Sequence, residues 1–74
     1  MQPIQFELDP AHDFVELNQL LKLAGLAHSG GTGKAIVASG AVRVDGQVEL
    51  RKTCKIRAGQ VVECEGVRIE VVTG

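Results

Sequence analysis

Aromatic side chains are nearly absent from this sequence. Among its 74 residues only Phe6 and Phe14 are aromatic, and there is no tryptophan or tyrosine. The core must therefore be built from aliphatic side chains. The shortage also excludes nucleic-acid binding that depends mainly on stacking bases on aromatic rings. Hydrophobic residues nevertheless make up 45% of the chain, which is ordinary for a folded domain and too many for a disordered one.

Cysteine and histidine are also scarce. Cys54 and Cys64 are too few for a secreted disulfide-stabilised mini-protein, and neither has a histidine or cysteine nearby at metal-ligand spacing. We expect both to be small buried hydrophobic residues, and we expect no metal and no cofactor. His12 and His28 are the only histidines, and no catalytic set can be assembled around them, so we do not expect an enzyme.

Long apolar runs are missing as well. No segment approaches the roughly 18 apolar residues of a membrane span. The first residues lack the basic stretch followed by an apolar run that marks a signal peptide. We therefore expect a cytoplasmic protein with no membrane partner. Its 74 residues are enough for one small domain, which we place over residues 1–74.

The net charge of −1 conceals an uneven distribution. Residues 34–57 contain six basic and two acidic residues, a net charge of +4, whereas the segments before and after them are acidic. A basic block between acidic flanks indicates a local anionic partner rather than a generally basic protein.

A strand and a helix are predicted in the first third of the chain. Apolar and polar residues alternate over residues 4–8, as in a half-buried strand. Asp13 and Glu16 have the spacing of a capping box that opens a helix, and Gly25 ends that helix. One helix face carries the apolar residues Phe14, Leu17, Leu20, Leu21 and Ala24.

A second helix is predicted to follow after a short link, so that the two helices pack as neighbours. Ser29 is a suitable N-cap, and Gly40 ends the helix. Its inner face holds Gly33, Ile36 and Val37.

After the second helix the hydrophobic period changes to two, which predicts strands. Residues 42–50 form a strong hairpin signal around Asp45-Gly46, because these residues adopt the positive φ angles of a two-residue turn. Residues 55–57 form a short extended piece, and residues 61–72 predict a second, weaker hairpin around Glu65-Gly66. The fold class is therefore α+β: two packed helices against a small twisted antiparallel sheet.

The middle of the chain also carries a series of motifs in a fixed order. They are a Gly-Leu-Ala turn, a serine cap, a helix with a basic residue, a hairpin and a late glycine before a strand: Gly25-Leu26-Ala27, Ser29, Lys34, Gly40, Val42-Arg43-Val44-Asp45-Gly46 and Gly59 before Val61-Val62. This series resembles the RNA-binding module named after the fourth protein of the small ribosomal subunit, the S-four-like domain, and most of all its free-standing bacterial members. The resemblance, with a core motif at about residues 14–64, implies the alpha-L type RNA-binding fold and a non-catalytic role in binding structured RNA.

Basic residues in and around the basic block are suited to phosphate contacts, because each neutralises backbone charge and releases counterions. Arg51, Lys52 and Lys55 lie close together after the first hairpin, and the resemblance implies that this region and the helices line one RNA-binding face. The predicted RNA-binding residues are Lys22, Lys34, Arg51, Lys52 and Lys55, with Arg57 and Arg43 held in reserve. The alternative is that these residues only make the surface soluble, and that Lys22 only complements the helix dipole.

Three positions that are commonly basic in the family are occupied by Glu16, Gly30 and Ala38. The resemblance therefore implies that the RNA contacts shift from the helices to the loop after the hairpin. The expected partner is structured RNA, ribosomal or another stable RNA, bound by a monomer. A protein–protein interaction module that has kept the RNA-binding scaffold stays open as the alternative function.

Residues 29–34 imitate a phosphate-binding loop without completing it. His28 stands where the motif needs its first glycine, and Ala35 where it needs a serine or threonine for magnesium, so nucleotide hydrolysis is excluded. One interpretation of the glycine-rich start of the helix is an anion-binding turn for an RNA phosphate, formed by Ser29, Gly30 and Gly31. The other is that these glycines only form the turn and that Gly33 allows close helix packing.

Overall fold

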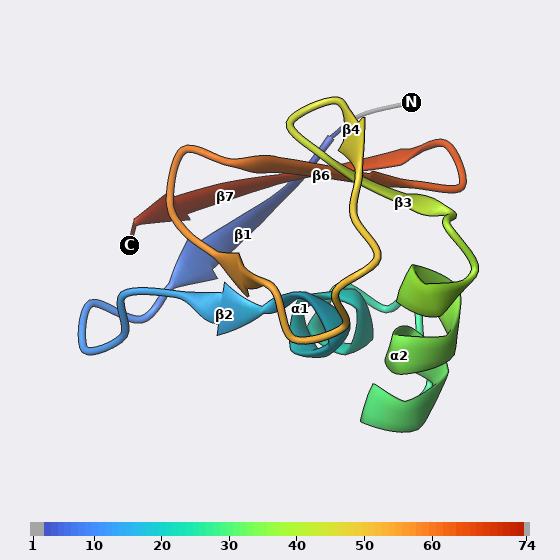
Figure 1. Ribbon diagram of the computed structural model, residues 1–74. Coiled ribbons are helices and arrows are strands. Elements are labelled where there is room, and N and C mark those ends of the chain that lie inside the picture. The colour runs from blue at the N-terminus through green and yellow to red at the C-terminus, as the bar shows by residue number, and fades with distance from the viewer. Residues whose placement is uncertain (1–2, 74) are drawn as a thin grey trace.

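A computed structural model describes residues 3–73, which form a sheet with two helices on one side of it (Figure 1). The five-stranded sheet has the order β1-β7-β6-β3-β4. Its strands are β1 (Ile4–Leu8), β3 (Val42–Val44), β4 (Gln47–Val48), β6 (Val61–Cys64) and β7 (Val67–Thr73). The predicted α+β class is confirmed.

One pairing in the sheet differs from the predicted antiparallel arrangement. β1 runs parallel to β7, from Ile4 opposite Ile69 to Leu8 opposite Thr73, while the other pairs in this sheet are antiparallel. A short hairpin turn forces two strands to be antiparallel, but strands joined by a long crossover can be parallel. β1 and β7 come from opposite ends of the chain, so no hairpin joins them and the sheet is mixed.

Both predicted hairpins are confirmed. Asp45 and Gly46 have φ angles of 51° and 83°, and Glu65 and Gly66 have φ angles of 52° and 79°. These are the left-handed conformations that a two-residue hairpin turn needs. Asp45 also holds the first hairpin against β6, because its carboxylate accepts a hydrogen bond from the backbone N–H of Val61 at 3.0 Å.

The first helix begins later than predicted. Val15–Glu16 forms a short strand, β2, which pairs antiparallel with β5 (Lys55–Ile56). Helix α1 covers only Leu17–Leu23, and Glu16 at its N-cap has an extended backbone and no side-chain capping bond. The predicted capping box is therefore wrong, and Phe14 lies outside the helix.

The backbone of a distant loop caps α1 instead. The carbonyl of Cys54 accepts a hydrogen bond from the N–H of Leu17 at 2.9 Å, and the carbonyl of Lys52 accepts one from Asn18 at 3.1 Å. The first N–H groups of a helix need such acceptors, and a side chain is only one way to supply them. The loop between β4 and β5 is thereby anchored to the start of α1, which brings its basic residues to the helices.

Helix α2 (Gly30–Ala38) begins as predicted, since the Ser29 hydroxyl accepts a hydrogen bond from the N–H of Thr32 at 3.2 Å. The two helices pack closely against each other. A Cβ atom at Gly33 would lie 2.6 Å from the carbonyl oxygen of Asn18. The packing role of Gly33 is confirmed.

The core is aliphatic, as the shortage of aromatic residues predicts. Its fully buried apolar side chains come from both helices, from β5 and from the sheet: Leu17, Leu20, Leu21, Val37, Val42, Ile56, Val62 and Ile69. Phe6 and Phe14 are only half-buried. Cys64 is buried as predicted, whereas Cys54 is half-buried, and burial raises the pKa of both free thiols.

Candidate nucleic-acid interface

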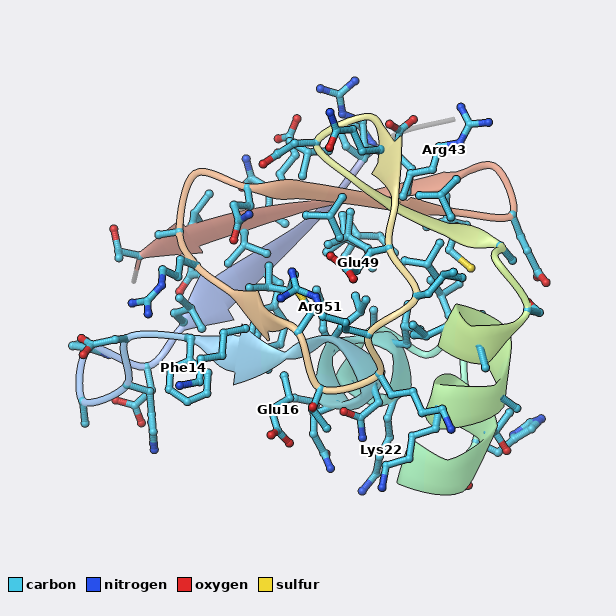
Figure 2. All side chains as sticks on the ribbon, viewed as in Figure 1. Phe14, Glu16, Lys22, Arg43, Glu49 and Arg51 are labelled. Carbon is cyan, nitrogen blue, oxygen red and sulfur yellow. The ribbon has the colours of Figure 1, made fainter. Side chains whose placement is uncertain are left out.

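Three segments that each carry a lysine meet at Asn18 of α1. Lys52 is the loop residue whose carbonyl bonds to the backbone N–H of Asn18. Lys34 follows Gly33, which lies against the Asn18 carbonyl. Lys22 comes one turn after Asn18 on α1, and its side chain points away from the sheet (Figure 2). We refer to Lys22, Lys34 and Lys52 as the lysine cluster.

The lysine cluster is exposed and carries uncompensated positive charge. No carboxylate oxygen of residues 3–73 lies within 4.0 Å of any of its three ammonium groups. An ammonium group in water that has no protein partner is free to exchange its counterion for a phosphate. The arrangement can therefore hold several negative charges at the junction of α1, α2 and the β4–β5 loop.

Arg51, which is predicted to act with these lysines, is held by Glu49 instead (Figure 2). Its Nε donates to Glu49 Oε2 at 3.0 Å, its Nη2 donates to Oε1 at 3.1 Å, and its backbone N–H donates to Oε2 at 2.9 Å. The pair offsets the charge of the guanidinium group, although 78% of the Arg51 side chain stays exposed. Arg51 is therefore oriented, and it is less available to a phosphate than the lysines.

Lys55 has a different neighbour. Its ammonium group lies 4.9 Å from the centre of the Phe14 ring, a cation–π contact, and Lys55 is opposite Glu16 in the β2–β5 pair. In Figure 2 Phe14 and Lys22 lie on either side of Glu16. Arg51 and Lys55 are close in sequence, but their side chains have different partners, Glu49 and Phe14.

Arg43 and Arg57 lie on other segments of the chain. Arg43 projects from β3 on the face opposite to its more buried neighbours, and Figure 2 shows it across the sheet from Lys22. Arg57 follows β5 in a turn, where its backbone N–H donates to Gln60 Oε1 at 2.8 Å. Three of the seven predicted RNA-binding residues, Lys22, Lys34 and Lys52, therefore lie on segments that meet at Asn18.

The S4 domain family model matches residues 7–72 of the chain. This chain belongs to the S4 domain family. The resemblance that the sequence motifs predict is thereby confirmed, over a longer stretch than the motifs alone cover.

Two curated relatives of this S4 domain are 52% identical to it over 61 residues. They are "Putative RNA-binding protein YbcJ" of Escherichia coli (strain K12) and "Uncharacterized protein YbcJ" of Shigella flexneri, and the matched stretch is 82% of this chain and 87% of each relative. The solution structure of E. coli YbcJ matches this fold with a TM-score of 0.74 at 47% identity, covering 97% of this chain and 90% of that one. That structure is described as revealing an alfaL motif involved in RNA-binding. The predicted alpha-L type fold is confirmed.

Sequence reasoning missed three residues around the basic side chains of this S4 domain. Asn18 is 2% exposed, and its Oδ1 has no hydrogen-bond partner among the described residues. The sequence does contain a signal for Asn18, since it is a polar residue placed one turn before Leu21, which belongs to the apolar face of the helix. Glu49, two residues before Arg51, and Phe14 beside Lys55 are the others, and neither contact has a periodic signal in the sequence.

Two further features of residues 3–73 bear on the chemistry of the site. No helix in this part of the chain is long and apolar enough to span a membrane. The same residues contain no group of three or more histidine, cysteine, aspartate or glutamate side chains placed to hold a metal ion.

The Glu49–Arg51 pair predicts an unusual titration. Hydrogen bonds from the Arg51 side chain, and then from its backbone, lower the pKa of Glu49 from 4.5 to about 2. Because the folded-state pKa is lowered, the pair stabilises the fold above pH 4.5, and this contribution is lost as the pH falls from 4.5 to about 2. An NMR titration of the Glu49 carboxyl should have its midpoint near 2 in the parent and closer to 4.5 in Arg51→Gln. A parent midpoint near 4.5 would show that the pair does not form in solution.

Proposed function

We propose that this S4 domain binds structured RNA without catalysing a reaction, and that the lysine cluster makes the main phosphate contacts. The observation that carries the proposal is that the segments bearing Lys22, Lys34 and Lys52 meet at Asn18, with no carboxylate of residues 3–73 paired to these lysines. Family membership, together with the name and the description of the YbcJ relative, supports RNA as the partner. We expect a ribosomal or another stable RNA, bound by a cytoplasmic monomer.

The contacts expected from these residues read the shape of the RNA and the position of its phosphates rather than its base sequence. Lysine is a mobile point charge, and no exposed aromatic platform accompanies the cluster. In this proposal Arg51, Lys55 and Arg57 add further phosphate contacts, whereas Arg43, which Figure 2 shows across the sheet from Lys22, makes none.

The predicted anion-binding turn at Ser29, Gly30 and Gly31 lies at the start of the helix that carries Lys34. The Ser29 hydroxyl already accepts the capping hydrogen bond from Thr32, so a phosphate contact in this turn would come from backbone N–H groups. This contact is secondary in the proposal, which does not depend on it.

The experiment is a titration of a structured ribosomal RNA fragment, and separately of total RNA, at several salt concentrations. Each phosphate contact contributes a slope of about −0.7 to −0.9 to the plot of log affinity against log salt concentration. Three contacts therefore predict that the affinity falls roughly 20- to 40-fold between about 50 and 200 mM salt. A fluorescence anisotropy measurement on a labelled fragment gives this slope directly.

Two results would contradict the proposal. No RNA binding at about 50 mM salt would favour the alternative of a protein-interaction module on an RNA-binding scaffold. RNA binding that changes little with salt would show that phosphate contacts are not the main source of affinity.

A further inference from the structure

A groove on the side of α1 away from the lysine cluster is not explained by RNA binding. It is a cavity of about 420 Å³ between β1, the loop after β1, β2 and α1. Its apolar lining includes Phe6, Phe14, Val15 and Leu23. The two phenylalanines and Val15 are half-buried, and 60% of Leu23 is exposed. Both aromatic residues of the chain therefore line one groove at the surface.

The rim of this groove is acidic. Glu7 of β1, Asp9 after it and Glu16 of β2 all line the cavity. The one basic-type side chain in the lining is His12, whose Nδ1 lies 4.0 Å from Asp9 Oδ2. The ammonium group of Lys55 lies over the Phe14 ring, 4.9 Å from its centre. Three carboxylates around an apolar floor repel a nucleic-acid backbone and attract cations.

Helix α1 separates the groove from the lysine cluster. Gln19 and Leu23 are four residues apart, share one face and line the groove. Lys22 lies about 100° around the helix from Leu23, on the same face as Asn18, whose backbone contacts α2. The exposed surface of α1 is therefore divided between an apolar, acid-rimmed groove and a basic edge, and the two surfaces can be occupied at the same time.

We propose that the groove binds a short segment of a partner protein that combines apolar side chains with lysine or arginine. The phenylalanines and Leu23 would receive an apolar side chain, and Glu7, Asp9 and Glu16 would pair with the cations that flank it. Charge complementarity is the argument for this occupant, since an acidic segment or an RNA would meet the carboxylates. In this arrangement the domain connects an RNA on one side of α1 to a basic protein on the other.

The test uses three synthetic twelve-residue peptides as probes: an amphipathic lysine–leucine peptide, a scrambled peptide of the same composition, and an amphipathic glutamate–leucine peptide. Each is titrated into 15N-labelled protein. We expect the lysine–leucine peptide to shift the amide signals of Phe6, Glu7, Gln19 and Leu23 and to leave those around Lys34 unchanged. The scrambled peptide should bind more weakly, and the acidic peptide should not bind.

The variants are chosen in matched pairs. Leu23→Gln in the groove is compared with Leu50→Gln outside it, because the two leucines are 60% and 59% exposed. The first should weaken peptide binding about fivefold or more, as removal of a central apolar contact does, and the second should leave it unchanged. Glu7→Gln is compared in the same way with Glu63→Gln on β6, an exposed acidic residue outside the groove.

Each other outcome overturns the proposal. Signal changes spread over the surface, or concentrated near Glu63 and Glu65, would show that the peptide only follows charge. Equal binding of the scrambled peptide would show that the apolar floor does not contribute to binding. An equal loss of affinity in Leu23→Gln and Leu50→Gln would show that the groove is not the binding site. Signal changes at Phe6 and Gln19 on adding RNA would assign the groove to the nucleic acid instead.

Discussion

Replacing Lys34 and Lys52 together by alanine should weaken RNA binding on the order of 100-fold at about 50 mM salt and reduce the salt slope by about two. The reason is the loss of two phosphate contacts that release counterions. Both side chains are exposed, so the fold should persist, since exposed substitutions cost within about 0.5 kcal/mol each. The dissociation constant is measured by fluorescence anisotropy at several salt concentrations, with the far-UV spectrum as a check on folding.

The matched control removes two positive charges from another surface. Arg43 and Arg68 line a separate cavity of about 230 Å³ together with Glu63 and Glu65. Arg43→Ala with Arg68→Ala changes the net charge by the same amount but should alter neither affinity nor salt slope substantially. If this control loses as much affinity as the lysine variant, binding depends on net charge and the lysine cluster is not the site.

Much of the fold could be predicted because short-range chemistry specifies it. The Asp45-Gly46 turn and the Glu65-Gly66 turn each require a left-handed backbone, and both form as predicted. The N-cap at Ser29 depends only on the nearby Thr32, and it also forms as predicted. The start of α1 could not be predicted in the same way. The acceptors for its first N–H groups are the backbone carbonyls of Lys52 and Cys54. Because every residue has a backbone carbonyl, the residue types do not show which ones will act as acceptors.

The sequence predicted which residues belong to the candidate site, but it did not predict how they are arranged in space. Charge and the family resemblance indicated Lys22, Lys34 and Lys52, but their convergence depends on how the loop meets α1. Arg51 and Lys55 carry the same charge in sequence, yet one is paired with Glu49 and the other lies over an aromatic ring. The side chains that folding places beside each basic residue decide whether its charge is available to a phosphate.

Replacing Gly33 by alanine should lower the melting temperature by roughly 5–15 °C, a loss of about 1–2 kcal/mol for a domain of this size. The added Cβ would lie 2.6 Å from the Asn18 carbonyl oxygen and 3.3 Å from the Asn18 Cα. These are backbone atoms, so the strain is relieved only by moving one helix. Overpacking costs about 1–3 kcal/mol, which exceeds the gain of up to about 1 kcal/mol from replacing glycine by alanine in a helix. Thermal unfolding followed by circular dichroism measures the change.

Gly31→Ala is the control that isolates this contact, because Gly31 lies in the same helix and its added Cβ would meet nothing nearer than the Ser29 Oγ at 3.8 Å. It should be neutral or raise the melting temperature, since only the helix propensity changes. Opposite signs for the two variants would establish that α1 and α2 are held together at Gly33 and Asn18. Because this contact also positions Lys34 relative to Lys22, Gly33→Ala should weaken RNA binding below its melting temperature while Gly31→Ala should not. Equal effects of the two substitutions on stability would contradict the close approach of the helices.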